Sequence, residues 1–271
     1  MKRSAVAACV ACAALAGLAG PAAAGVGVIG GLTREVTLQP AGSSEGRILL
    51  RNSGDEPQDV KVYPTDYLFY ADGRVVYAEP GTIPRSSARW ITIYPHQVTV
   101  PAGGSDSVSY VIHVPEDGDL RGTYWSTVMV EPIVPETVEL PKPEEGKVQI
   151  GIRTVTRYAI QMVVHIGDTG ERKLRFAERQ LLVHEGKRIL QLDVENVGER
   201  RLVPILWAEL YNEQGESIGR FEGGRLCTYP GCSARFRIDL SEVPAGKYKA
   251  LVVADCGGDE VFGAQYDMEL P

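Results

Sequence analysis

The chain has almost no helical periodicity; apolar and polar residues instead alternate in short runs rich in Val, Ile, Thr and Tyr. Such alternation points successive side chains to opposite faces, which is the pattern of a half-buried β-strand. Turn-forming clusters such as Asn52-Ser53-Gly54-Asp55 separate the runs. We therefore predict an all-β protein. The strands predicted in the first half of the chain are Glu35–Gln39, Gly46–Arg51, Asp59–Tyr63, Arg74–Tyr77, Trp90–Ile93, Val108–Val114, Tyr124–Glu131 and Lys147–Ile166.

A second block continues the pattern with seven runs, a number and spacing typical of an immunoglobulin-like β-sandwich. Trp207 falls on the third run, where such folds bury an aromatic side chain. Tyr248 follows Pro244-Ala245-Gly246-Lys247, as in a tyrosine corner; simple core packing is the alternative for this side chain. The predicted strands are Leu174–Val183, Arg188–Glu195, Val203–Tyr211, Ser217–Leu226, Ala234–Leu240, Tyr248–Asp255 and Val261–Leu270.

We expect the two blocks to form two tandem immunoglobulin-like β-sandwich domains. The first would cover residues 25–166 and the second residues 174–271, joined by a polar, glycine-containing linker at 167–173. Within the first domain, Pro132–Gly146 contains four prolines and four glutamates and has no apolar period. Loops of this length in a compact domain are usually functional or disordered, so we expect a long exposed loop there.

The first 24 residues have the layout of a secretory signal peptide. Lys2 and Arg3 give a positive start, Ala5–Ala19 is a run of small and apolar residues, and Ala22-Ala23-Ala24 fits a cleavage site. A retained membrane anchor is one alternative, and a lipoprotein signal with Cys9 as the lipidated residue is another. We expect cleavage after residue 24 and a mature chain that is periplasmic or secreted.

Charge and hydropathy exclude two kinds of partner. The formal net charge is −7, and loss of Lys2 and Arg3 with the signal peptide makes the mature chain more acidic still. Such a chain has no basic face to neutralise phosphates, so we expect no nucleic-acid partner. No apolar run long enough to span a bilayer occurs after the N-terminus, so we expect no stable membrane span in the mature protein.

One run is longer than a small sandwich accommodates. From Val148 to Ile166 apolar and polar residues alternate over 19 residues, whereas most strands have about 3 to 10. If this segment lies at a sheet edge, its unpaired N–H and C=O groups can accept a strand from another chain. The alternative is an interior strand that is already paired on both sides. The residues predicted to form the strand-addition edge are Val148, Ile150, Ile152, Thr154, Thr156 and Tyr158.

Three cysteines remain once the signal peptide is removed. Cys227 and Cys232 flank the connection between the fourth and fifth runs of the second block, and Cys256 follows the sixth. These connections lie at the same end of such a sandwich, so we expect the thiols to cluster and one disulfide to form in an oxidising compartment. The bridge could join Cys227 to Cys232, or either of them to Cys256. The alternative to a disulfide is a metal site in which the three thiolates are the ligands.

The sequence contains no motif for catalysis. There is no G-x-S-x-G nucleophile elbow and no phosphate-binding loop, and Asp117-Gly118-Asp119 lacks the further carboxylates of a calcium loop. We therefore expect a protein that is not an enzyme and that uses no metal or cofactor. Catalysis would require an active site formed by residues that are distant in the sequence and meet only in the fold. The histidines, none of which has metal-ligand spacing, are His96, His113, His165 and His184.

Two immunoglobulin-like domains after a signal peptide, with a long last strand in the first domain, resemble the periplasmic pilus chaperones (PapD-like). Thr33-Arg34-Glu35-Val36 resembles their first strand, Asn52-Ser53-Gly54 their Asn-x-Gly turn, and Gln149-Ile150-Gly151-Ile152-Arg153-Thr154 the start of their long subunit-binding strand. The resemblance implies a cleft between the domains in which two basic side chains hold the terminal carboxylate of a pilus subunit. The matching positions are Arg34 and Arg157.

The sequence departs from that family at two points. Arg157 stands where the family usually has Lys, and Gln161-Met162 stands in place of the Arg-Pro pair that usually closes the long strand. What the resemblance implies is a chaperone-like assembly factor that binds a surface or pilus subunit by strand addition, with an outer-membrane usher as a possible second partner. A structural or adhesive cell-envelope protein without chaperone activity is the alternative.

Overall fold

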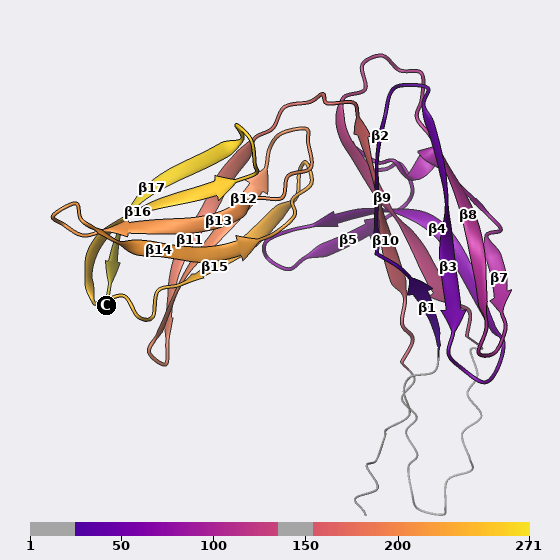
Figure 1. The fold of residues 1–271 in the computed structure, drawn as a ribbon, viewed down its shortest axis with the longest axis horizontal. Helices are drawn as coiled ribbons and strands as arrows, with labels where there is room; N and C mark the ends of the chain where they lie inside the picture. The colour runs from indigo at the N-terminus through magenta and orange to yellow at the C-terminus, as the bar shows by residue number, and fades with distance from the viewer. Residues whose placement is uncertain (1–24, 135–153) are drawn as a thin grey trace, which may run out of the picture.

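The computed structural model describes residues 25–134 and 154–271. They form two β-sandwiches that meet at one end and diverge in an L shape (Figure 1). The described chain is all-β apart from one short 3₁₀ turn, η1 (Ala88–Trp90), so the predicted fold class is confirmed. The predicted signal peptide, and the predicted loop from residue 135 onward, lie outside the described residues.

The first sandwich consists of two sheets whose members come from distant parts of the chain. One sheet has the order β1-β3-β8-β6, and the other has the order β2-β10-β9-β4-β5, with β7 also paired to β4. In the first sheet the strands are β1 (Val26–Ile29), β3 (Ser43–Asn52), β6 (Ile91–Tyr94) and β8 (Ser105–His113). In the second they are β2 (Thr33–Leu38), β4 (Gln58–Phe69), β5 (Val75–Ala78), β7 (Gln97–Val100), β9 (Gly122–Pro132) and β10 (Tyr158–Ile166).

The second sandwich pairs a three-stranded sheet, β11-β12-β15, with a four-stranded sheet, β14-β13-β16-β17. All seven strands predicted for this block are present, with ends that differ by no more than about two residues from the predicted ones. Their bounds are β11 (Leu174–His184), β12 (Lys187–Asn196), β13 (Ile205–Tyr211), β14 (Ser217–Arg225), β15 (Ser233–Asp239), β16 (Gly246–Asp255) and β17 (Val261–Leu270).

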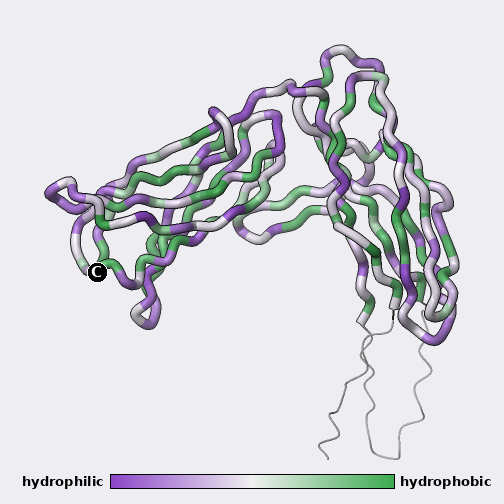
Figure 2. Tube along the Cα trace, viewed as in Figure 1, coloured by the Kyte–Doolittle hydropathy of each residue, from purple (hydrophilic) through white to green (hydrophobic). Residues whose placement is uncertain are grey.

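Each sandwich has its own core, made by side chains of facing strands. Figure 2 shows hydrophobic and hydrophilic residues following one another along the strands of both sandwiches. In the first, residues of β3 such as Ile48 and Leu50 pack against β10 residues such as Ile160 and Met162. In the second, Phe236 of β15 packs with residues of β13 and β16. The alternation in the sequence therefore arises from burial of one face of each strand.

Two short strands and one side-chain environment differ from the predictions. β1 and β7, each of four residues, were not predicted. Trp207 is not in the core; it alternates with the buried Leu206 and Ala208 and so lies on the outer face of β13, where the Arg220 guanidinium carbon lies 3.8 Å from its ring centre. Tyr248 does form the predicted corner, since its hydroxyl donates to Pro244 O at 2.9 Å.

A small apolar cluster joins the two sandwiches. Tyr229 of the second sandwich is fully buried; its ring stacks on Trp125 with centroids 5.1 Å apart and meets Phe69 edge-on at 5.9 Å. The hairpin between β4 and β5 also reaches across (Figure 1), and there Ala71 N–H donates to Ser233 Oγ at 2.9 Å. These contacts fix how the first sandwich presents β10 toward the second.

Within the part of the chain that the structure describes, no helix has the length and apolar character required to span a bilayer.

Candidate functional site

The long strand predicted from Val148 to Ile166 is shorter than expected within the described residues. Strand pairing begins at Tyr158, opposite Val130 of β9, and ends at Ile166. Thr154 and Thr156 are exposed and are not part of a strand, which corrects their assignment. Three further predicted edge residues, Val148, Ile150 and Ile152, lie outside the described residues.

Most of β10 is an interior strand. It pairs antiparallel with β9 along its whole length, and from Gln161 to Ile166 it also pairs in parallel with β2, Thr33 lying opposite Gln161. These six residues therefore form an interior strand that is paired on both sides, which was the alternative interpretation of the long run. The predicted edge residues end at Tyr158, before this part of β10, which the first part of the chain covers.

The start of β10 is different, because β2 does not extend along it. Among the described residues, Tyr158–Ile160 pair with β9 alone. Leu32 O, just before β2, accepts the N–H of Gln161 at 2.8 Å. Because N–H groups of alternate residues point to the same edge of a strand, Ala159 N–H points to that same side, where no strand of residues 25–134 or 154–271 pairs with it. We call the unpaired side of Tyr158–Ile160 the free edge.

The free edge arises because the chain changes sheets between β1 and β2. β1 pairs with β3 in one sheet, and β2 pairs with β10 in the other. The crossing uses Gly30-Gly31, and Gly30 has a φ of 97°, a conformation that favours glycine. β1 therefore stays on the opposite sheet and leaves the start of β10 uncovered.

A groove of about 440 Å³ lies between β1 and the free edge. Apolar side chains line much of it, including Val26, Val28, Val155 and Tyr158, while Arg51 and Gln58 supply polar groups. Val26 belongs to the core of the first sandwich, and Tyr158 packs against that core. The groove is therefore an opening in the side of the sandwich, beside a strand with unpaired backbone groups.

The structure does not bring Arg34 and Arg157 together. Arg34 lies opposite Met162, whose side chain is buried in the core, and its guanidinium folds back to donate to Gly31 O. Arg157 reaches instead toward β9, where its Nη1 lies 3.8 Å from Glu131 Oε1.

Two residues that the sequence analysis missed join Arg157 at Glu131. Lys61 Nζ lies 3.3 Å from Glu131 Oε2, and the Tyr63 hydroxyl donates to the same oxygen at 2.6 Å. Burial raises the pKa of Glu131, but the bonds from Tyr63 and Lys61 outweigh this effect and hold its pKa below the usual value. Lys61 and Glu131 are cross-strand partners of β4 and β9, a register that sequence patterns do not specify.

A polar network crosses from the first sandwich to the second near the other end of β10. His165 Nε2 lies 2.6 Å from Glu35 Oε1, and His165 Nδ1 lies 2.9 Å from Thr123 Oγ1. Arg201, from the second sandwich, donates its backbone N–H to Thr123 Oγ1 at 2.9 Å and places its Nη1 3.3 Å from Glu35 Oε2. These four side chains connect β2, β9 and β10 to the second sandwich.

The protonation states of the network follow from its geometry. Burial lowers the pKa of His165 despite its bond to Glu35. Burial raises the pKa of Glu35, but the bond from His165 and the charge of Arg201 outweigh it, so this pKa is lowered overall. The lowered pKa favours the neutral form of His165, and an ionised carboxylate only accepts, so the proton of the neutral ring lies on Nε2 and Nδ1 accepts from Thr123.

The predicted disulfide is not formed in the structure, where Cys227, Cys232 and Cys256, the cysteines among the described residues, are free thiols. The three side chains do not share one packing cluster. Cys227 and Cys232 belong to the cluster around Trp125 between the sandwiches, whereas Cys256 packs against the core of the second sandwich. Burial raises the pKa of Cys232 and of Cys256 to about 11, so both thiols are protonated at neutral pH. Residues 25–134 and 154–271 contain no group of three or more His, Cys, Asp or Glu side chains placed to hold a metal ion.

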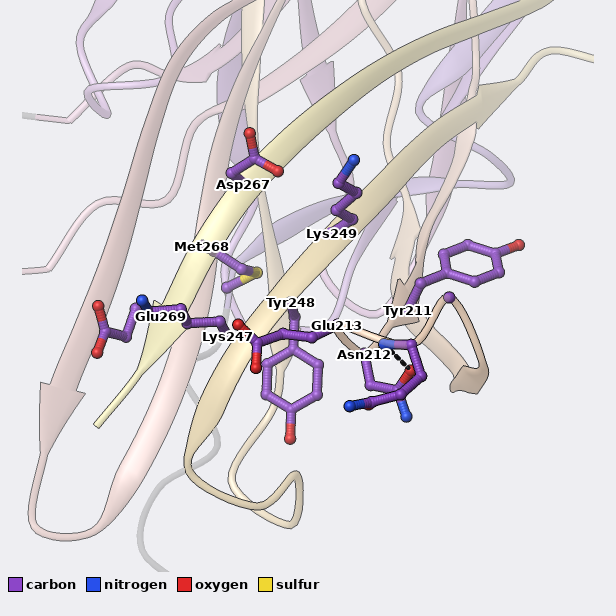
Figure 3. A pocket seen from close by; sticks show the side chains of 11 residues that line it. Tyr211, Asn212, Glu213, Lys247, Tyr248, Lys249, Asp267, Met268 and Glu269 are labelled. Carbon is purple, nitrogen blue, oxygen red and sulfur yellow. Dashed lines mark hydrogen bonds between the residues drawn. The ribbon is translucent and has the colours of Figure 1, made fainter.

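A second cavity, of about 730 Å³, lies on the second sandwich where β13 ends, β16 begins and β17 ends (Figure 3). Its lining includes the aromatic rings of Tyr211 and Tyr248 and the charged side chains of Lys249 and Asp267. No residue of this cavity belongs to the free edge or to the network around His165.

No protein-family profile and no curated protein sequence matches the chain. Several solved structures of fimbrial chaperones are similar to it. A chain from the chaperone–tip adhesin complex of CFA/I fimbriae biogenesis has a TM-score of 0.48 and 14% identity, covering 90% of this chain and 98% of that chain. The class 5 fimbriae chaperone CfaA has a TM-score of 0.44 and 12% identity, covering 91% and 99%.

A third similar structure comes from Acinetobacter baumannii. It is a chain of the CsuC–CsuE chaperone–tip adhesion subunit pre-assembly complex from archaic chaperone-usher Csu pili, with a TM-score of 0.44 and 12% identity. It covers 89% of this chain and 98% of its own length. PapD-like fimbrial chaperones are thus among the solved structures that this chain is similar to, as the sequence resemblance indicates.

Proposed function

We propose that the chain binds another polypeptide by accepting a strand at the free edge of β10. The observation that carries this proposal is the unpaired side of Tyr158–Ile160, where Ala159 N–H points outward next to an open groove. A strand laid between β1 and β10 would gain main-chain hydrogen bonds from the edge. Its alternate side chains would enter the groove beside Val26 and Tyr158, closing the open side of the sandwich.

We further propose that a carboxylate of the partner is anchored by Arg157 together with Lys61. Both cationic groups lie beside the Glu131 carboxylate, near the end of β9. Arg157 is well exposed and immediately precedes the free edge, so it is placed to exchange Glu131 for a partner carboxylate. In this proposal Arg34 has no part in the anchor, because it lies on the core side of β2.

The proposed role is that of an exported, non-enzymatic assembly chaperone in the periplasm, with a surface or pilus subunit as partner and an usher as the site of delivery. A subunit that lacks one strand exposes apolar core, and a donated or accepted strand covers it until assembly. The fimbrial chaperones similar to this chain include ones solved in complex with tip adhesins. A structural or adhesive envelope protein is the competing role.

The test is expression of the affinity-tagged full chain in the periplasm, with recovery of what it holds. The proposal expects a polypeptide in one-to-one ratio that aggregates when this chain is absent. Ala159→Pro removes the outward N–H but keeps the hydrogen bonds of the neighbouring residues to β9, so it should abolish recovery of the partner. Ala159→Ser keeps the N–H, so the partner should still be recovered with this variant. Purification of the wild-type chain as a stable monomer without a partner would support the envelope-protein role instead.

A further inference from the structure

The last strand of the second sandwich has an unusually regular outer edge. β17 is the final member of the order β14-β13-β16-β17. It pairs with β16 over all ten of its residues, from Asp255 opposite Val261 to Gly246 opposite Leu270, without a register shift. On its other side no strand of residues 25–134 or 154–271 pairs with it (Figure 1).

Of the three other edges of this sandwich, β15 has only seven residues, and β11 and β14 are interrupted. β11 has a register shift between Phe176 and Glu178, and β14 has two shifts against β13. Such bulges are a common way to prevent edge-to-edge pairing, as are prolines and lysines on the edge. β17, with the sequence VFGAQYDMEL, has no bulge, no proline and no lysine.

The side chains of β17 complement those of an antiparallel copy of the same strand. If Gln265 faces Gln265 of the second copy, Phe262 faces Met268 on one side of the sheet and Ala264 faces Tyr266. All four side chains are partly buried, and those of Phe262, Tyr266 and Met268 pack against the core, so their pairing would extend an apolar layer. On the other side of the sheet, Val261 faces Glu269 and Gly263 faces Asp267, so no carboxylate opposes another carboxylate.

The acidic residues of β17 are balanced within their own chain. Lys249 of β16 lies opposite Asp267, and Lys247 lies opposite Glu269. Figure 3 shows these four side chains at the ends of β16 and β17 beside the cavity. A second copy of β17 would therefore not meet an uncompensated row of negative charge.

We propose that β17 pairs antiparallel with β17 of a second copy of this chain, about a two-fold axis at Gln265. The same surface serves both partners, so the arrangement is closed and stops at a dimer. Two four-stranded sheets become one continuous sheet across the axis, and the backbone groups of both edges are satisfied together.

Sedimentation equilibrium of the full mature chain tests this proposal. The wild-type chain is expected to form a dimer, and Gln265→Lys should weaken the dimer by about tenfold or more, because two lysines then face each other at the axis. Ile218→Lys is the matched control: it adds the same charge to β14, at the opposite edge of the sheet, on a side chain that is 38% exposed. It should dimerise as the wild type does.

Three outcomes would overturn the proposal: a wild-type chain that stays monomeric at the highest concentration reached, a Gln265→Lys variant that dimerises as the wild type does, or a dimer lost in Ala159→Pro. The last result would place the contact at β10 instead. Thermal melting of each variant shows whether it is folded, and Gln265→Ser replaces the lysine variant if that one is unfolded. Because β17 lies in the second sandwich, failure here leaves the proposed role of β10 untouched.

Discussion

Tyr229 of the second sandwich stacks on Trp125 of the first, with ring centroids 5.1 Å apart. Trp125 lies on β9, the strand that pairs with β10 along the whole length of β10. The hydroxyl of Tyr229 also donates to Gln161 Oε1 at 2.8 Å, at the point where β10 passes from its free edge to its paired part. The contact between the domains is thus built onto the strand proposed to bind the partner.

Replacing Tyr229 by Ala should loosen the connection between the domains. The ring is fully buried, so its loss leaves a cavity against Trp125 and should cost about 3 kcal/mol or more of unfolding free energy. Small-angle X-ray scattering should then show a broader distribution of interdomain distances. Tyr229→Phe keeps the ring, loses the bond to Gln161, and should cost about 1 kcal/mol with an unchanged scattering curve. An Ala variant with the wild-type distribution would contradict this role.

The network around His165 predicts a specific loss of stability in mild acid. Because burial lowers the pKa of His165 in the folded protein, the unfolded chain binds a proton more readily. The stabilisation that neutral His165 provides is therefore complete above the ordinary histidine pKa. It is lost as the pH falls from that value toward the lowered pKa of the folded protein. The pKa of Glu35 is also lowered, so ionised Glu35 stabilises the fold at neutral pH as well. That stabilisation is lost at a lower pH than the stabilisation from His165, as the pH falls below the ordinary carboxyl pKa.

We expect the unfolding free energy of the wild-type chain to fall between about pH 7 and pH 5. His165→Gln should reduce stability at pH 7 by about 1 to 3 kcal/mol, because Glu35 and Thr123 lose a buried partner, and should flatten the slope between the two pH values. Urea unfolding at both pH values measures this. His184→Gln is the control, since that side chain is 86% exposed, and it should retain the wild-type slope.

Arg157 and Lys61 are predicted to act together on the partner. The double variant Arg157→Ala and Lys61→Ala should weaken binding by about 10- to 100-fold, the range expected when charge-assisted bonds to a carboxylate are lost. Arg34→Ala should leave the affinity unchanged, because that side chain folds onto Gly31 on the core side of β2. Titration calorimetry with the co-purified partner measures the affinity of each variant. Equal weakening in the double variant and in Arg34→Ala would contradict this prediction and would show that Arg34 also binds the carboxylate.

Local patterns in the sequence predicted the strands of the second sandwich and the corner at Tyr248, because both depend on neighbouring residues. They did not predict that β2 would cover part of β10, since that pairing joins Thr33 to Gln161, far apart in the chain. The same limit explains why Lys61 was missed beside Glu131. The pairing of Arg34 with Arg157 came from the family resemblance, and in this structure the two side chains contact Gly31 O and Glu131 instead. Which residues meet at a site depends on register between distant strands, and alternation alone does not define it.

The amide exchange rate of Ala159 tests strand addition most directly. In the free chain its N–H meets no strand, so it should exchange rapidly, whereas Gln161 N–H, bonded to Leu32 O at 2.8 Å, should be protected. With the co-purified partner bound, we predict that exchange at Ala159 slows by about 100-fold or more while Gln161 stays protected. Exchange at Ala159 that is equally fast with and without the partner would contradict strand addition at β10.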